Sequence, residues 1–291
     1  MKSCAFLTMD SLGGYVCYDE MLIEPFQNIG WSVESVSWRD TSANWNAFNT
    51  VIIRSPWDYH DDPEAFLSVL ETIDASSAVL ENPLETVKWN LHKSYLLDLD
   101  KRGVPIVPTI LFEGFTISGL EDAFGKFKTD EIVIKPAVSA TAKDTFRITS
   151  KELRKNLETL ENLYYERDLL IQPFMQSIVD EGEFSLFYFG GNLSHTILKT
   201  PQTDSFFVQE EHGGILTSAD PEAELVTAGR NVFRSITPSP LYARVDLVGT
   251  TNGFAVMELE LIEPSLYFNM DTDSPKRFAD AFERRMKSLD I

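Results

Sequence analysis

Three carboxylates near the C-terminal end of the sequence have the spacing of residues that share one face of a sheet. Asp246 lies in one apolar run, two residues after Arg244, and Glu258 and Glu260 lie two residues apart in the next run. Successive side chains of a strand point to opposite faces, so each pair shares a face. If the two strands are neighbours, three carboxylates converge among apolar residues. Burying them requires a cation, and hard oxygen ligands favour Mg²⁺ or Mn²⁺ bridging phosphates. Alternatively, the acids point outward from a half-solvated sheet.

Two lysines are candidates for binding phosphate. Lys93 starts a helical stretch, and Lys135 closes the apolar run 132–136. A lysine that ends a buried strand can point its ammonium into a cleft. The small-residue segment 137–144 follows Lys135, and its backbone N–H groups could surround phosphate oxygens. Taken singly, the lysines are equally compatible with a surface position and the segment with a simple turn.

A third candidate is the apolar run 169–174, which leads into the acidic turn 180–183. Its extended part, 171–174, can offer backbone donors and acceptors to an adenine edge, and the following carboxylate can bind ribose hydroxyls. A strand followed by a hairpin is the alternative interpretation.

Several other chemistries lack their motifs in this chain. There is no GxGxxG, no GxxxxGK[ST], no GxSxG and no HExxH, and the four histidines, at 60, 92, 195 and 212, have no metal-binding spacing. We interpret His195 as structural. The two cysteines, Cys4 and Cys17, form no CxxC pair and indicate neither a disulfide framework nor a zinc site.

The net charge of the chain argues against two classes of binding partner. With 45 acidic and 25 basic residues the chain carries a net charge of −20, which opposes binding to nucleic acid or anionic lipid. No membrane span or targeting segment is recognised, so we expect a folded cytoplasmic protein. At 291 residues, it is long enough for about two domains.

The elements that must position these residues fall into two patterns. Up to Asn82, strand-type runs and helical patterns alternate, which indicates βαβ units on a parallel sheet, and the remainder has the pattern of α+β units. The expected strands cover 3–9, 31–36, 50–54, 79–81, 132–136, 169–174, 183–189, 192–198, 242–248 and 254–261. The expected helices cover 19–29, 63–75, 91–102, 120–128, 150–163, 221–236 and 275–289.

The order of these features resembles the ATP-grasp superfamily. A lysine is followed by a second lysine with a small-residue loop, then by a buried strand with an acid, and finally by Asp246 and Glu-x-Glu. Within the superfamily the chain is most similar to the prokaryotic glutathione synthetase branch. Tracts such as 242–246 and 258–265 are also similar to the cyclo-ligases of D-cycloserine biosynthesis. The resemblance implies an N-terminal βαβ substrate-side domain over 1–90, a small lobe or lid over 91–178 and a large lobe with the metal site over 179–291.

The resemblance also implies roles for single residues. The implied ATP-binding residues are Lys93, Lys135, Ser139, Thr141, Gln172, Pro173, Phe174 and Glu183. The implied ligands of Mg²⁺ or Mn²⁺ are Asp246, Glu258 and Glu260. Arg244 and Lys199 are implied to be catalytic, and the implied substrate-binding residues are Arg54, His212 and Gly213. The segment 202–214 resembles the flexible loop that closes over the reactants.

The chain departs from the family pattern at two places. The small-residue segment 137–144, which would be the phosphate loop, lacks the usual glycines. Glu260 stands where the family commonly has Asn.

The implied activity is an ATP-dependent ligase that activates a carboxylate as an acyl phosphate for attack by an amine. An amine in the same molecule would make it a cyclo-ligase. The alternatives are a non-catalytic ATP-binding regulatory protein and a small-molecule kinase. The expected partners are small-molecule carboxylates and amines, and the chain is a candidate homo-oligomer.

Overall fold

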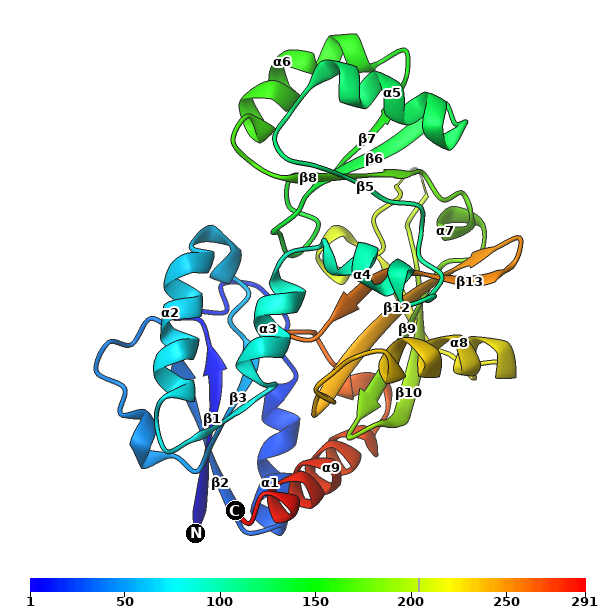
Figure 1. Ribbon diagram of the computed structural model, residues 1–291. Coiled ribbons are helices and arrows are strands. Elements are labelled where there is room, and N and C mark those ends of the chain that lie inside the picture. Colours follow the sequence, from blue (N-terminus) through cyan, green and yellow to red (C-terminus); the bar gives the residue numbers. More distant parts are fainter. Residues whose placement is uncertain (204) are drawn as a thin grey trace.

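The computed structural model describes residues 1–203 and 205–291, whose strands form three sheets (Figure 1). The first sheet is parallel, with the order β2-β1-β3-β4. Its strands are β1 (Lys2–Thr8), β2 (Trp31–Ser37), β3 (Thr50–Ser55) and β4 (Val79–Glu81). The connecting helices are α1 (Ile23–Asn28) and α2 (Pro63–Asp74). The predicted βαβ arrangement is therefore confirmed.

Helix α2 shows how local sequence sets these elements. Asp62 precedes the helix, and its carboxylate accepts a hydrogen bond from the backbone N–H of Ala65 at 3.1 Å. Pro63 occupies the first turn, where its missing N–H costs nothing. Phe66, Leu70 and Ile73 repeat at helical spacing and are buried, so α2 covers the sheet with one apolar stripe.

The second sheet in the chain is small and antiparallel, with the order β5-β8-β6-β7. Its strands are β5 (Ile110–Phe112), β6 (Glu131–Pro136), β7 (Phe146–Thr149) and β8 (Leu169–Pro173). Helices α5 (Ile117–Phe127) and α6 (Leu153–Tyr164) lie together above this sheet at the top of the molecule (Figure 1). Strands β5 and β7 are only three and four residues long, and their short apolar runs carried no recognisable period in the sequence.

The third sheet is antiparallel, with the order β11-β10-β9-β12-β13. Its strands are β9 (Glu183–Phe189), β10 (Asn192–Thr200), β11 (Ile215–Ser218), β12 (Tyr242–Thr250) and β13 (Gly253–Glu260). Helix α8 (Ala223–Arg234) packs on β12 and β13, and helix α9 (Ser274–Ser288) packs on β9 and β10. A short helix, α7 (Ser177–Asp180), precedes β9. The boundaries at residues 90 and 178 remain predictions.

The predicted helix over 91–102 is wrong in its extent. Helix α3 (Leu84–Leu91) ends where that helix was expected to begin, and α4 (Tyr95–Lys101) starts later. Between them His92 has extended backbone angles, and the backbone N–H of Lys93 donates to the carbonyl of Ala137 at 2.8 Å. This long-range hydrogen bond replaces the helical one and fixes Lys93 beside the loop that follows β6.

The remaining helical segments are short 3₁₀ turns. They are η1 (Asp19–Leu22), η2 (Trp45–Ala47), η3 (Tyr59–Asp61), η4 (Glu210–His212) and η5 (Phe268–Met270). Among the described residues, no helix combines the length and the apolar character that crossing a membrane requires.

An aromatic core joins the first sheet to the C-terminal helix. Phe282 of α9 stacks on Phe26 at 4.7 Å between ring centroids and meets Trp31 edge-on at 4.8 Å. Figure 1 shows α9 beside α1 at the base of the molecule. The two ends of the chain therefore share one core, which fixes the N-terminal sheet against the large antiparallel sheet.

We expect Phe282→Ala to lower the free energy of unfolding by about 3–5 kcal/mol, because it leaves a cavity beside the rings of Phe26 and Trp31. Lys287→Ala on the same helix, at an exposed position, should change it by less than about 0.5 kcal/mol. Urea unfolding of both variants measures the difference. Equal stabilities would show that α9 contributes little to the shared core.

Candidate functional site

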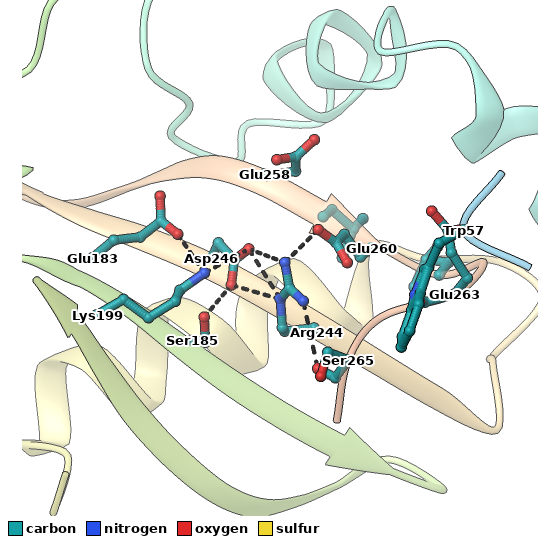
Figure 2. Close-up of polar contacts among 12 residues, drawn as sticks. Trp57, Glu183, Ser185, Lys199, Arg244, Asp246, Glu258, Glu260, Glu263 and Ser265 are labelled. Carbon is teal, nitrogen blue, oxygen red and sulfur yellow. Dashed lines mark hydrogen bonds and ion pairs between the residues drawn. The ribbon is translucent and has the colours of Figure 1, made fainter. Parts of the chain in front are cut away.

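The strand register brings the three predicted carboxylates together. In the antiparallel pair β12–β13, Arg244 lies opposite Glu260 and Asp246 lies opposite Glu258. Carboxylate oxygens of Asp246, Glu258 and Glu260 all lie within 4.8 Å of one another (Figure 2). The expectation that adjacent strands make these acids converge is confirmed. Metal binding by them remains a prediction.

Two cations from the same sheet neutralise Asp246, which is buried. The Arg244 guanidinium donates to both of its oxygens, at 3.0–3.1 Å, and also to Glu260. The Lys199 ammonium lies 2.6 Å from Glu183 and 3.5 Å from Asp246. Burial raises the pKa of Asp246, but the charges of Arg244 and Lys199 outweigh it and hold that pKa below its usual value. The sheet thus carries a buried network of alternating charge.

Lys93 and Lys135 act on another of the three carboxylates, Glu258. The Lys93 ammonium lies 2.6 Å from Glu258 and donates to the carbonyl of Ser139 at 3.0 Å. Although burial raises the pKa of Glu258, Lys93 and Lys135 lower it to about 2. Lys135 is 8% exposed, and in the described chain no carboxylate lies within 4.0 Å of its ammonium. Burial therefore lowers the pKa of Lys135.

A single cavity is lined by most of the predicted residues. It lies between the small sheet and the large antiparallel sheet. The predicted site residues that line it are Lys93, Lys135, Ser139, Thr141, Gln172, Pro173, Phe174, Glu183, Lys199, Arg244, Asp246, Glu258 and Glu260. Three others, Arg54, His212 and Gly213, are not among its lining residues.

One end of the cavity is apolar and suits a flat ring. Phe174 lies there with Met175, Ile178 and Met257. The Arg147 guanidinium stacks over Phe174, 3.6 Å from its ring centroid. Planar aromatic surface and adaptable methionine side chains are typical of sites that bind a heteroaromatic ring.

Arg54 does not line this cavity and pairs with an acid elsewhere. It is buried, and its guanidinium lies 2.8 Å from Asp19 and donates to the carbonyl of Pro264. It also lies over the ring of Tyr242, 5.4 Å from the centroid. These contacts hold the loop after β13 against the N-terminal sheet, and the contact of Arg54 with substrate remains a prediction.

The predicted phosphate loop, within the segment 137–144, adopts left-handed backbone conformations without glycine. Thr141, Ala142 and Asp144 have φ values of 53°, 54° and 58°. Asp144 is held by Arg167 at 2.7 Å and by the Tyr164 hydroxyl, which donates to its carbonyl. His212 reaches this loop, with its Nε2 atom 3.1 Å from the carbonyl of Thr141. The predicted closing loop over 202–214 includes residue 204, which lies outside the described residues.

Three aromatic and acidic residues at the other end of the cavity carried no specific role in the sequence. They are Tyr59, Glu263 and Tyr267, and Trp57 lines the cavity with them. Glu263 follows Glu258 and Glu260 in a run of three acids, which is the signal that could have found it. Burial raises the pKa of Glu260 to about 7 and that of Glu263 to about 8, and neighbouring carboxylates add to both shifts.

This arrangement of three sheets is the fold of the ATP-grasp ligases. The structure superimposes on a D-alanine–D-alanine ligase from Bacillus anthracis with a TM-score of 0.68 and 13% identity, covering 100% of both chains. The predicted fold class, α/β and α+β in an ATP-grasp arrangement, is confirmed.

More similar matches are to proteins of D-cycloserine biosynthesis. Residues 4–82 match the family model described as "D-cycloserine synthetase DcsG, N-terminal domain". The cycloserine biosynthesis protein DcsG of Streptomyces lavendulae is 29% identical over 97% of this chain and 98% of its own length. A crystal structure of D-cycloserine synthetase DcsG superimposes with a TM-score of 0.88 and 26% identity, covering 98% of this chain and 99% of that one. The predicted similarity to ATP-grasp ligases and to the D-cycloserine cyclo-ligases is confirmed: the chain has the ATP-grasp fold and is an ATP-dependent ligase.

The structural interpretation of His195 leads to a test. Its ring is buried, stacks on Phe187 at 4.2 Å, and has its Nε2 atom 3.1 Å from the carbonyl of Leu266. Burial lowers its pKa from 6.5 to about 4. Between these values the unfolded chain binds a proton that the folded protein does not, so His195 makes the free energy of unfolding fall as pH falls from 6.5 to 4.

Replacing His195 by Gln removes this titration. We expect the wild-type free energy of unfolding to fall by about 3 kcal/mol more than that of His195→Gln over the same pH interval. Urea unfolding at several pH values between 6.5 and 4 measures both slopes. Parallel curves would show that His195 is protonated equally in the folded and unfolded states.

Proposed function

We propose that this chain is a cyclo-ligase that uses ATP to close a ring in a small amino-acid-like carboxylate. Similarity to D-cycloserine synthetase extends over nearly the whole chain, including the N-terminal domain, which is the substrate-side domain of the predicted organisation. The substrate class is a small molecule in which a carboxylate and a nucleophilic amine are close enough to join.

The observation that carries the proposal is the buried ammonium of Lys135. A buried charge is costly unless an opposite charge compensates it, and none of the described carboxylates lies within ion-pair distance of this lysine. It lines the cavity with Lys93 and Lys199, so three ammonium groups face one space. The polyphosphate of ATP supplies the negative charge that this wall lacks.

The other predicted ATP contacts follow if the polyphosphate lies against these lysines. The apolar end of the cavity binds adenine between Phe174 and the methionines, and Gln172 and Pro173 form the edge of that pocket. Glu183 accepts hydrogen bonds from the ribose. Ser139 and Thr141 belong to the loop that covers the phosphates, and His212 and Gly213 belong to the segment that reaches this loop.

The carboxylate group fits a hard divalent cation. Asp246, Glu258 and Glu260 offer three oxygen ligands within 4.8 Å of one another, the donor type that Mg²⁺ prefers. These residues would hold Mg²⁺, which when bound neutralises charge on the phosphates. Mn²⁺ suits the same ligands.

The chemistry then needs positioning and charge stabilisation rather than a protein nucleophile. A carboxylate oxygen of the substrate attacks the γ-phosphorus, the bond to the β-phosphate oxygen breaks, and ADP leaves. The amine of the same molecule then attacks the acyl carbon, loses a proton, and expels inorganic phosphate. Lys93, Lys135 and Lys199 stabilise the charge of the transferred phosphoryl group, and Arg244 stabilises the oxyanion of the acyl intermediate.

The role of Lys135 predicts opposite effects on stability and binding. Without nucleotide, we expect Lys135→Met to leave the free energy of unfolding unchanged or to raise it. The substitution replaces an uncompensated buried charge by an apolar side chain of similar volume. ATP affinity should fall by roughly 10- to 1,000-fold. Urea unfolding and titration calorimetry with Mg-ATP measure the two effects. Lys155→Met, on the exposed side of α6, is the control. Loss of stability with unchanged affinity would contradict the assignment.

The ligase chemistry is tested by product analysis. Purified protein is incubated with Mg-ATP, hydroxylamine and a panel of amino acids, hydroxy acids and short peptides. We expect substrate-dependent ADP, a trapped hydroxamate, and, without hydroxylamine, a product one water lighter than the substrate. Asp246→Asn and Glu258→Gln should each lower the rate of ADP formation by roughly 100-fold or more, because each removes a carboxylate that would hold Mg²⁺ at the phosphates.

The control variant is Asp180→Asn, an exposed acid of α7 outside the cavity. ADP formation with a phosphorylated substrate and no hydroxamate would identify a kinase instead. Unchanged activity in both variants would remove the carboxylate group from the mechanism.

A further inference from the structure

The end of the cavity opposite the adenine pocket is built by two segments from distant parts of the chain. Trp57 and Tyr59 come from the loop after β3, and Glu263 comes from the loop after β13. The indole N–H of Trp57 donates to the backbone carbonyl of Glu263 at 2.9 Å. Figure 2 shows Glu263 beside Trp57, on the far side of Glu260 from Asp246. The N-terminal substrate-side domain thus holds this acid in place.

Glu263 differs from the other acids of the cavity in its partners. Glu183, Asp246, Glu258 and Glu260 each pair with a lysine or arginine. Glu263 is 9% exposed, and in the part of the chain that the structure describes no lysine, arginine or histidine nitrogen lies within 4.0 Å of it. Its side-chain partner is the hydroxyl of Tyr59. A carboxylate buried with no cation requires one from a ligand, or a proton.

The surroundings select the type of cation. A divalent metal ion requires several oxygen ligands, and the acid group with that geometry is Asp246, Glu258 and Glu260. Around Glu263 the cavity offers its carboxylate, the Tyr59 hydroxyl and the aromatic surfaces of Trp57 and Tyr59. One charge-assisted hydrogen bond together with aromatic faces is the environment that binds an alkylammonium group.

We propose that Glu263, with Tyr59 and Trp57, binds the ammonium group of the substrate and makes the ligase selective for amino acids. This inference rests on the proposed function, because it places the substrate carboxylate toward Arg244 and the phosphate-binding lysines. A substrate held this way lies across the cavity, with its positive group against Glu263 and its reacting carboxylate against the cationic wall. The high pKa of Glu263 agrees with a group that lacks its cation when no substrate is bound.

Selectivity follows from the same contacts. A hydroxy acid of the same shape offers no positive charge, and binding it leaves Glu263 uncompensated. A site built for a charged group rejects the analogue that lacks it much more strongly than an apolar pocket rejects a missing methylene. We therefore expect amino acids to bind at least roughly 10-fold more tightly than their hydroxy counterparts.

The test measures binding, so that it does not depend on turnover. Titration calorimetry with protein saturated with Mg-ADP compares two matched pairs, D-serine with D-glycerate and D-alanine with D-lactate. In the wild type the amino acid of each pair should bind more tightly. Glu263→Gln keeps the shape of the side chain and removes its charge, so it should reduce that preference to about onefold. Glu263→Asp should retain part of it, and Tyr59→Phe should weaken the amino acid without abolishing the preference.

Each result decides the inference. Loss of the preference in Glu263→Gln, with ATP affinity and thermal stability retained, supports the ammonium site. An equal preference in wild type and Glu263→Gln, or no preference or no binding in the wild type, overturns it. None of these results bears on ligase chemistry, which is decided separately by ADP and hydroxamate formation, so failure of the two proposals is distinguishable.

Discussion

The buried contact of Asp246 with Arg244 and Lys199 is the interaction on which the site depends. Each charge would be prohibitively costly alone, and the three are tolerated because neighbouring strands β9, β10 and β12 bring them within hydrogen-bond or ion-pair distance. The sheet must keep its register for the network to survive, since a slip of one residue would turn every charge to the opposite face. The strand register that the fold requires therefore also sets the electrostatics of the site.

Two charged side chains that line the cavity have no partner of opposite charge within 4.0 Å among the described residues. One is the buried cation Lys135, and the other is the buried acid Glu263, beside Trp57 and Tyr59. Other acids and cations of the cavity pair with one another. A ligand that carries phosphate at one end and an ammonium group at the other would complete the pattern, and ATP together with an amino-acid substrate has this distribution of charge.

The local sequence predicted those strands and helices whose apolar residues repeat with a clear period. It did not predict features that depend on contacts between distant parts of the chain. The alternation around Asp246 and the Glu-x-Glu run predicted two strands and a shared face because period two is a property of the backbone. The break before Lys93 was invisible because it depends on a hydrogen bond to Ala137, 44 positions along the chain from it. The burial of Arg54 depends likewise on Asp19, and the isolation of Glu263 depends on which cations the fold leaves out of reach. These are properties of tertiary structure.

The glycine-poor phosphate loop shows how a departure from the family pattern can be accommodated. Left-handed conformations at Thr141, Ala142 and Asp144 cost roughly 1–2 kcal/mol each for residues with a Cβ atom. Contacts of Asp144 with Arg167 and Tyr164 offset part of that cost. Residues other than glycine also have less conformational freedom to lose when a loop becomes ordered. We therefore expect a loop already held in this shape to lose less entropy than a glycine-rich loop when it binds a ligand. Such a loop is less flexible but better preorganised.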